Sequence, residues 1–271
     1  WRLEGSMEIV VCIKQVPATT RVQLDPRTRT IIREGVELML NPFDAYALEE
    51  ALRLREANGG TVSVMTMGIP GAAMLLREAL AIGADQAILL TDRRFAGADT
   101  LATATTLAAA IHKRGVVDLI LCGRQAIDGD TAQVGPELAE KLGIPHVTAV
   151  AKIEEVNAGM LTCQKMIDEG YARLKVQLPA LLTVVKEINT PRFPTLAGFR
   201  RAQKSDILIW KAEDLEVDLG HIGLEGSPTQ VIATFVPEHD KTSHLVEGTL
   251  PEIAQQILAS LQKQTGREMH G

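Results

Sequence analysis

Residues 123–136 carry the run of the 271-residue chain that is most suggestive of chemistry, GRQAIDGDTAQVGP. Its three glycines let backbone N–H groups approach a ligand closely. Asp130, Thr131 and Gln133 have side chains that cap or donate at a helix start, where the helix dipole favours a phosphate group. A phosphate-binding loop and an ordinary polar connection both fit this pattern, because a glycine-rich loop alone is a weak signal. Pro136 leaves the start of the following helix open.

Several other kinds of catalytic chemistry lack their sequence patterns. No G-x-G-x-x-G follows the first apolar run, and no G-x-x-x-x-G-K-[ST] occurs, which disfavours a Rossmann dehydrogenase and a P-loop NTPase. The six histidines and three cysteines show no metal-ligand spacing, and no G-x-S-x-G elbow is present. Asp128 and Asp130 suit turn formation and capping better than a Mg²⁺ site. With no catalytic side chain in evidence, the chemistry is expected to belong to a bound nucleotide cofactor.

Composition excludes further classes of protein. Aromatic residues make up only 3% of the chain, and the net charge is −6, so a nucleic-acid partner is not expected. No apolar run reaches the roughly 20 residues that a membrane helix needs, so no membrane insertion is predicted. The sparse cysteines and the lack of a signal peptide favour a cytoplasmic location. Residues 1–6 are expected to be an artificial extension ahead of Met7.

The elements that position the 123–136 run alternate between strand and helix. Apolar strands are predicted at 8–14, 61–67, 86–90 and 116–122, with helices opening at Asn41-Pro42 and covering 71–82, 98–113 and a stretch ending near Leu142. Residues 22–33 fit a hairpin excursion. This alternation predicts an α/β fold with a doubly wound, mainly parallel sheet and helices on both faces. Ligands bind such sheets at the carboxyl ends of the strands, where 12–17, 65–70, 91–99 and 123–135 lie.

The pattern changes after residue 147. Strands at 147–153, 161–167 and 171–176 are joined by short turns and predict an added antiparallel β meander, followed by a strand at 180–188. Residues 189–204 hold two prolines and are predicted to form a loop. Residues 205–249 are weakly patterned, and a last helix opens at Leu250-Pro251. We therefore expect a nucleotide-binding α/β domain at 7–188, a loop at 189–205 and a C-terminal arm at 206–271.

Five motifs in this order resemble the β subunit of the electron transfer flavoprotein family. They are NPFDAYALEEA at 41–51, ALAIGAD at 79–85, GRQAIDGDTAQ at 123–133, LPA at 178–180 and PRFPTL at 191–196. In that family the β subunit forms a heterodimer with an α subunit that carries FAD, and itself binds AMP in some members and a second FAD in others. The resemblance implies nucleotide contacts at Cys12, Asn41, Pro42, Phe43, Asp44, Met67, Gly123, Arg124, Gln125, Ala126, Ile127, Asp128, Gly129, Asp130, Thr131, Ala132, Gln133 and Val134.

The identity of the nucleotide depends on one position of the loop. AMP-binding members resemble Asn-Gln-Thr or Asn-Gln-Ser where this chain has Ala132-Gln133-Val134, and Val134 has no hydroxyl to offer a phosphate. The segment 128–136 instead resembles the electron-bifurcating members, whose β subunit holds FAD. In those complexes NADH supplies a hydride, one electron goes to ferredoxin or flavodoxin, and the other goes through the α-subunit FAD to an acyl-CoA dehydrogenase. The chain would act as an oxidoreductase only within such a complex.

The non-bifurcating alternative has a structural AMP in this site and carries electrons between acyl-CoA dehydrogenases and a quinone reductase. A nucleotide-binding stress or signalling module is a further alternative from another class, and the 191–196 loop and the long tail argue against it. Arg124 fits a contact with phosphate or flavin as well as it fits a surface salt bridge.

The segment 191–196 resembles the family's partner-recognition loop, in which a leucine docks into a pocket of the dehydrogenase. This implies partner contacts at Pro191, Arg192 and Leu196, whereas an ordinary role for Leu196 would be packing of the loop on the core. The arm at 206–271 is expected to pack on the α subunit.

Overall fold

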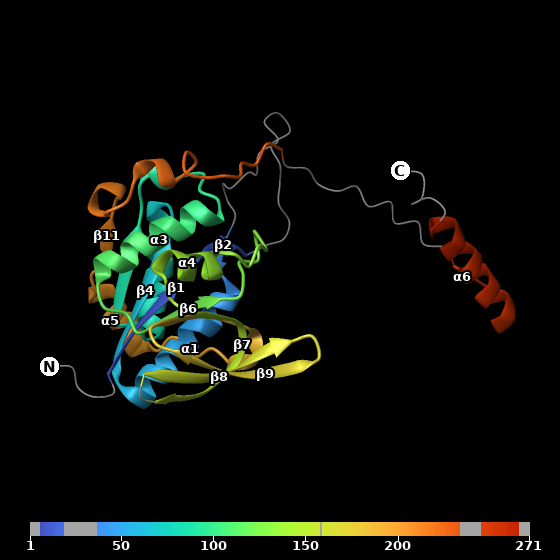
Figure 1. Ribbon diagram of the computed structural model, residues 1–271, viewed down its shortest axis with the longest axis horizontal. Coiled ribbons are helices and arrows are strands. Elements are labelled where there is room, and N and C mark those ends of the chain that lie inside the picture. Colours follow the sequence, from blue (N-terminus) through green and yellow to red (C-terminus); the bar gives the residue numbers. More distant parts are fainter. Residues whose placement is uncertain (1–5, 19–36, 158, 234–244, 266–271) are drawn as a thin grey trace. The chain divides into compact units, whose positions relative to one another are not determined.

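The computed structural model describes residues 6–18, 37–157, 159–233 and 245–265 (Figure 1). The chain divides into a unit of residues 1–232 and a unit of residues 233–271, which are described separately. The strands are β1 Met7–Cys12, β2 Gln15–Pro17, β3 Leu38–Leu40, β4 Gly60–Met67, β5 Gln86–Leu90, β6 Leu119–Gly123, β7 His146–Asn157, β8 Met160–Ile167, β9 Gly170–Gln177, β10 Ala180–Val184 and β11 Leu208–Trp210. The α-helices are α1 Pro42–Asn58, α2 Ala73–Ile82, α3 Thr100–Arg114, α4 Val134–Leu142, α5 Leu196–Lys204 and α6 Leu250–Thr265.

Nine strands form one mixed sheet in the order β11-β5-β4-β1-β6-β10-β7-β8-β9. All neighbours from β11 to β7 are parallel, and β7, β8 and β9 pair antiparallel. The predicted α/β class and mainly parallel sheet are therefore confirmed. The antiparallel meander is also present, as a continuation of the main sheet.

Alternation along the central strands builds two cores. Ile9 and Val11 of β1 pack with Leu48 of α1 on one face of the sheet. Val10 of β1 packs with Leu107 of α3 on the other face. Successive side chains of a strand point to opposite faces, so a continuous apolar run such as that of β1 can bury both. Figure 1 shows α3 and α4 on one side of the sheet and α1 on the other.

The order of the strands reverses beside β1. The chain runs from β1 to β4 and β5 on one side, and then returns to place β6 on the other side of β1. Ligands of open α/β sheets bind outside the carboxyl ends of the strands at such a switch point. In this chain that point lies where Cys12 of β1 and Cys122 of β6 are register partners, and the loop predicted to bind phosphate begins there.

The predicted loop at 189–204 is wrong for its second half, which is helix α5. Thr195 caps this helix, since its Oγ accepts a hydrogen bond from Gly198 N at 3.0 Å. Ala202 of α5 is buried in the core that α2 also lines. The loop was predicted because of Pro191 and Pro194. Both prolines lie before the first turn of α5, where they do not interrupt the helix.

Two other expectations need adjustment and one cannot be judged. The strand predicted at 180–188 ends at Val184 and gives way to a 3₁₀ turn at Lys186–Ile188. The strand β11, within the stretch expected to be an arm, instead extends the sheet beside β5. The hairpin expected at 22–33 lies outside the described residues; β2 and β3, which flank it, pair antiparallel.

The second unit contains helix α6. Glu252 of its first turn accepts hydrogen bonds from Thr249 N and Thr249 Oγ1, both at 2.8 Å, as in a capping box. Ile257 and Leu258 of its expected apolar face are about half exposed. Within the described residues, no helix has the length and apolar character needed to cross a bilayer.

Candidate functional site

Asn41 fastens the loop that follows β6. Its side chain is 1% exposed; Nδ2 donates to Gln125 O at 2.9 Å, and Oδ1 accepts from Ile127 N at 3.2 Å. Asn41 occupies the N-cap position of α1, as predicted, with Pro42 as the first helical residue, but its side chain makes no capping bond. The amide side chain therefore shapes the loop rather than the helix.

Asp44 joins the two strands of the switch point. Its Oδ2 accepts from Lys14 N, just beyond β1, at 2.7 Å, and its Oδ1 accepts from Gly123 N, at the end of β6, at 3.1 Å. Burial raises the pKa of this carboxyl to about 7, although hydrogen bonds from Asn41, Lys14 and Gly123 act in the opposite direction. Gly123 fits here because a Cβ would clash with Phe43 and Asp44.

The raised pKa of Asp44 predicts how stability depends on pH. Between its ordinary value of 3.8 and about 7 the folded chain binds this proton more tightly than the unfolded chain does. The free energy of unfolding should therefore fall as the pH rises through this window, by up to about 4 kcal/mol for this one group. Asp44→Asn removes the titrating group, so the difference between the wild type and this variant in urea unfolding should follow the same curve from pH 4 to 8. A difference that is constant or grows with pH would contradict the assignment.

The loop itself is held in a tightly specified conformation. Lys14 Nζ pairs with Asp128 Oδ1 at 2.7 Å, and Gln125 Nε2 donates to Asp130 Oδ1. Asp130 and Ala132 have positive φ angles of 53° and 55°, which cost a non-glycine residue energy and cluster at functional sites in proteins. The loop is therefore shaped by contacts from β1 and α1 rather than by local preference.

Helix α4 begins at Val134 with no side-chain cap, so the expected capping by Asp130, Thr131 or Gln133 is not found. Pro136 is the third helical residue and settles the question of where the helix starts. Gly135 lies so close to Thr183 of β10 that an added Cβ would require a shift. This close packing brings the uncapped helix start, with its free backbone donors, against the sheet, an arrangement suited to an anion.

A cavity of about 490 Å³ opens beside this helix start. The loop after β6 forms one wall, and the start of β7, the end of β8 with the turn that follows it, and the end of β10 form the other. The lining residues are Arg124, Ala132, Thr148, Ala149, Met166, Ile167, Asp168 and Thr183. A volume of this size is in the range of small-molecule and cofactor sites, and none of the described residues that line it is aromatic.

Charge and backbone geometry distinguish this cavity. The Arg124 guanidinium makes no ion pair with any residue that the structure describes. Ala149, on the facing wall, has a positive φ of 56°, and its N–H donates to Thr183 Oγ1 at 3.1 Å. The register of β7 shifts next to Ala149, as bulges do where a strand turns toward a site. The cavity thus presents an unpaired cation and irregular backbone on opposite walls.

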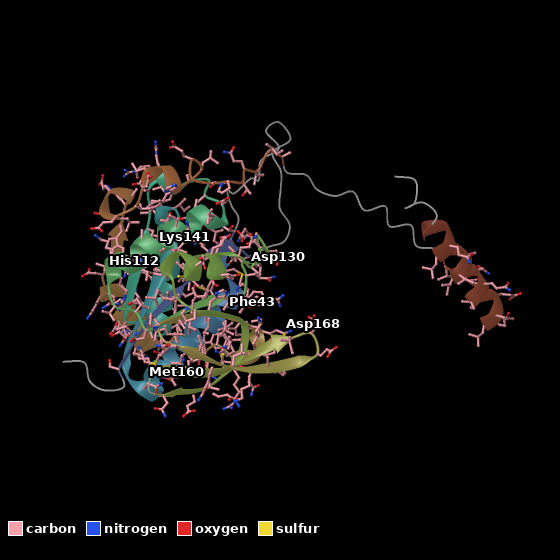
Figure 2. All side chains as sticks on the ribbon, viewed as in Figure 1. Phe43, His112, Asp130, Lys141, Met160 and Asp168 are labelled. Carbon is pink, nitrogen blue, oxygen red and sulfur yellow. The ribbon has the colours of Figure 1, made fainter. Side chains whose placement is uncertain are left out.

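The predicted nucleotide contacts gather at one edge of the sheet. In Figure 2, Asp130, Phe43 and Asp168 lie along the side of the first unit where the strands end, and His112 lies on the opposite side. Asn41, Asp44, Gly123, Gln125 and Ile127 are joined by the hydrogen bonds above, and Arg124 and Ala132 line the cavity. The remaining predicted positions lie on the same elements, with Cys12 ending β1 and Met67 ending β4.

Cys12 is 9% exposed and hydrogen bonded to Cys122, its register partner on β6. This contact and burial raise the pKa of the Cys122 thiol well above its ordinary value. The Cys122 thiol therefore stays protonated at neutral pH, and both cysteines serve as small apolar packing groups beneath the loop.

Sequence reasoning missed the second wall of the cavity. Thr148, Ala149, Met166, Ile167 and Asp168 come from the antiparallel strands and the β8–β9 turn, and were assigned no role. Only the polar turn at 168–170 was visible in the sequence, and nothing there indicated that it would reach a loop some 40 residues earlier.

The three residues expected to contact a protein partner lie apart from this cavity. Leu196 is the first residue of α5 and is 82% exposed. Arg192 is paired with Glu49 and Glu56 of α1, and Pro191 lines a second, smaller pocket with Tyr46 and Asn189. Among the described residues no group of His, Cys, Asp and Glu is arranged to hold a metal ion.

The chain is similar to known proteins over most of its length. Residues 28–215 match the family described as "Electron transfer flavoprotein domain". The "Electron transfer flavoprotein subunit beta" of Thermoanaerobacterium thermosaccharolyticum is 50% identical over 94% of this chain and 98% of its own length. "Caffeyl-CoA reductase-Etf complex subunit CarD" of Acetobacterium woodii is 49% identical over 95% and 98%. "Protein FixA" of Azorhizobium caulinodans is 47% identical over 85% of each chain.

The switch-point loop and its cavity define an α/β protein with a candidate ligand site at the carboxyl ends of its parallel strands. With matches of this extent, the chain belongs to the electron transfer flavoprotein family, among its β subunits. Membership implies a role in electron transfer and association with a flavin or nucleotide in general. It decides against the alternative of a stress or signalling module.

Proposed function

We propose that the chain is the β subunit of an electron-bifurcating electron transfer flavoprotein and binds FAD in the cavity beside α4. The observation that carries this proposal is the cavity itself. Arg124, which has no ion-pair partner among the described residues, lies on one wall, and aliphatic and hydroxyl side chains lie on the other together with Met166 and Asp168. The uncapped start of α4 suits the pyrophosphate.

FAD fits these residues better than AMP alone. Val134 is the first residue of α4 and offers a phosphate its backbone N–H but no hydroxyl. AMP would use the helix start and leave the 490 Å³ cavity without an occupant. A ring system without aromatic neighbours would be held by backbone, aliphatic and glycine contacts, in keeping with the 3% aromatic content.

The chemistry that FAD supplies is acceptance of a hydride from NADH and release of single electrons, one to ferredoxin or flavodoxin and one through the second FAD of the α subunit to an acyl-CoA dehydrogenase. The chain's own residues bind and orient: Asn41 and Asp44 fix the loop, and Arg124 places a positive charge on the cavity wall. A relative whose name places it in a caffeyl-CoA reductase complex supports a partner that acts on a CoA thioester.

The assembly proposed is a heterodimer with an α subunit, on which the C-terminal unit of residues 233–271 packs as an arm. The stretch 206–232 expected to share this role includes β11, which belongs to the sheet. Leu196 would dock into the dehydrogenase, and Pro191 and Arg192 flank it.

An assay of electron distribution tests the bifurcating function. The purified αβ complex, with NADH, an acyl-CoA dehydrogenase and its enoyl-CoA substrate, should reduce ferredoxin in step with the enoyl-CoA. NADH oxidation in which the enoyl-CoA is reduced and ferredoxin is not would contradict it.

Arg124 is expected to matter for cofactor retention. Arg124→Ala removes a charge-assisted contact and should weaken FAD binding about tenfold to a hundredfold. Flavin released from the complex on dilution, followed by fluorescence, measures the change. Lys141→Ala, at the other end of α4, alters the net charge equally and should have no effect. An Arg124→Ala complex with wild-type affinity and wild-type flavin potential would assign this residue to the surface only.

A further inference from the structure

Three apolar side chains are exposed on residues 193–199, here called the docking segment. Phe193 is 90% exposed, Leu196 82% and Phe199 49%. Arg200 and Lys204, on the same helix, are also exposed and add positive charge beside them. Large apolar side chains gathered on a short exposed segment mark an interaction surface.

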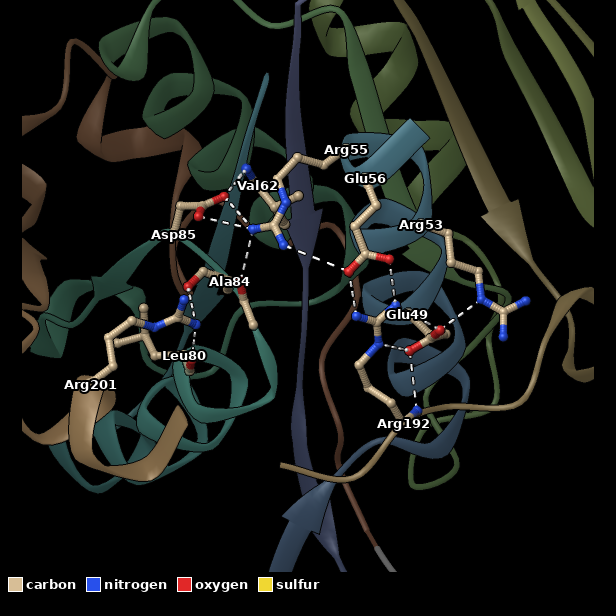
Figure 3. A network of polar contacts seen from close by, with 11 residues as sticks. Glu49, Arg53, Arg55, Glu56, Val62, Leu80, Ala84, Asp85, Arg192 and Arg201 are labelled. Carbon is tan, nitrogen blue, oxygen red and sulfur yellow. Dashed lines mark hydrogen bonds and ion pairs between the residues drawn. The ribbon is translucent and has the colours of Figure 1, made fainter. Parts of the chain in front are cut away.

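Arg192, which immediately precedes the docking segment, fixes the N-terminal end of the segment to α1. Its Nε donates to Glu49 Oε2 at 2.8 Å, its backbone N donates to the same oxygen at 3.1 Å, and its Nη2 donates to Glu56 Oε2 at 3.0 Å. Glu49 is 3% exposed and is also bound by Arg53. Burial raises the pKa of Glu49, but the bonds from Arg192 and Arg53 outweigh it and hold the pKa below its ordinary value. Figure 3 shows these arginines converging on the two glutamates.

The residues that follow the docking segment in α5 fix its C-terminal end to α2. Arg201 Nη2 donates to Leu80 O at 2.8 Å, and Arg77 Nη1 donates to Ser205 O at 3.1 Å. Gly198 lies against the Ala81 carbonyl, where a Cβ would clash. Arg55 lies between these two sets of contacts. It pairs with Asp85, which follows α2, at 2.8 Å, and lies 4.0 Å from Glu56 of α1 (Figure 3).

We infer that Arg192 and Arg201 are positioning residues that hold Phe193, Leu196 and Phe199 as one preformed surface. The partner that fits this surface is a protein with an apolar pocket rimmed by acidic side chains, and the inference rests on the proposed docking of the acyl-CoA dehydrogenase. Immobilising side chains and a loop on binding costs free energy, so a segment ordered beforehand binds more tightly than a free one. The Arg192 guanidinium donates its hydrogen bonds to Glu49 and Glu56, so Arg192 affects the partner through the position of the docking segment and not by direct contact.

Glu49 separates a positioning role from a direct contact. A side chain that is 3% exposed cannot touch a partner, so any effect of Glu49→Gln on docking must pass through the arginines that it binds, Arg192 and Arg53. Glu56→Gln weakens the ion pair that the more exposed Glu56 makes with Arg192. It supplies a second variant if Glu49→Gln folds poorly. Arg173→Ala is the matched control, because it removes a comparable arginine–glutamate pair on β9, at the far edge of the sheet.

The experiment measures KM and kcat of the αβ complex for the dehydrogenase, together with flavin content. Glu49→Gln, Glu56→Gln and Arg192→Ala should each raise KM about fivefold to tenfold, with kcat and flavin content unchanged. Phe193→Ala should raise KM as well, and Arg173→Ala should not.

Two failures are distinguishable. If Phe193→Ala and Leu196→Ala leave KM unchanged, the segment is not the docking surface, and both the proposed docking and this inference are wrong. If those two raise KM while Glu49→Gln and Glu56→Gln do not, docking stands and the positioning role is overturned, whatever Arg192→Ala does.

Discussion

Asn41→Ala should reduce FAD binding by about a hundredfold, the largest effect expected of a single side chain in this site. The substitution removes two hydrogen bonds of a side chain that is 1% exposed and leaves Gln125 O and Ile127 N without these partners. Each buried group left unpaired costs about 1–3 kcal/mol, and 1.4 kcal/mol is a factor of about ten in affinity. The strained backbone at Asp130 and Ala132 then loses its support. Titration of the flavin-depleted αβ complex with FAD measures the loss.

Asn58→Ala is the matched control for this prediction. Asn58 ends the same helix, and its Nδ2 also donates to a backbone carbonyl, that of Leu54, at 2.9 Å. Its replacement should leave FAD affinity unchanged. An Asn41→Ala complex that binds FAD within threefold of the wild type would mean that the loop does not need this anchor.

Leu196→Ala should lower kcat/KM for electron delivery to the acyl-CoA dehydrogenase by about thirtyfold, the size of effect typical of a buried interface anchor. Because Leu196 is 82% exposed, its loss should not change the free energy of unfolding or the flavin content. Stopped-flow transfer between the reduced αβ complex and the dehydrogenase measures the effect. Val116→Ala, at another exposed aliphatic residue, should transfer electrons at the wild-type rate, and a wild-type rate for Leu196→Ala would remove this residue from the interface.

The fold was largely predictable because its signals are local. Apolar runs alternating with helical periods predict a doubly wound sheet, and the Asn41-Pro42 pair correctly marks the start of α1. Helix α5 was not predicted because two prolines immediately before it indicated a loop. The helix has only nine residues, and it is stabilised by the Thr195 cap and by packing on α2. Tertiary contacts of this kind leave little trace in local sequence.

The site was predictable on one wall only. The loop at 123–134 stands out by its glycines and polar residues, and both Asn41 and Asp44 prove to be bonded to it or to its first residue. The facing wall depends on the pairing of β10 with β7 and on the irregular register at Ala149, and long-range strand pairing cannot be read from a single sequence. Likewise, the pairing of Arg192 with Glu49 and Glu56 of α1 could not be read from the sequence.

The nucleotide content of the purified αβ complex tests the central claim most directly. Visible absorbance, with chromatography of the released nucleotides, gives the number of FAD and AMP molecules per heterodimer. We expect two FAD and no AMP, because the cavity beside α4 offers room for a ring system and Val134 offers no hydroxyl to a lone phosphate. One FAD together with one AMP would contradict it and assign the chain to the non-bifurcating type.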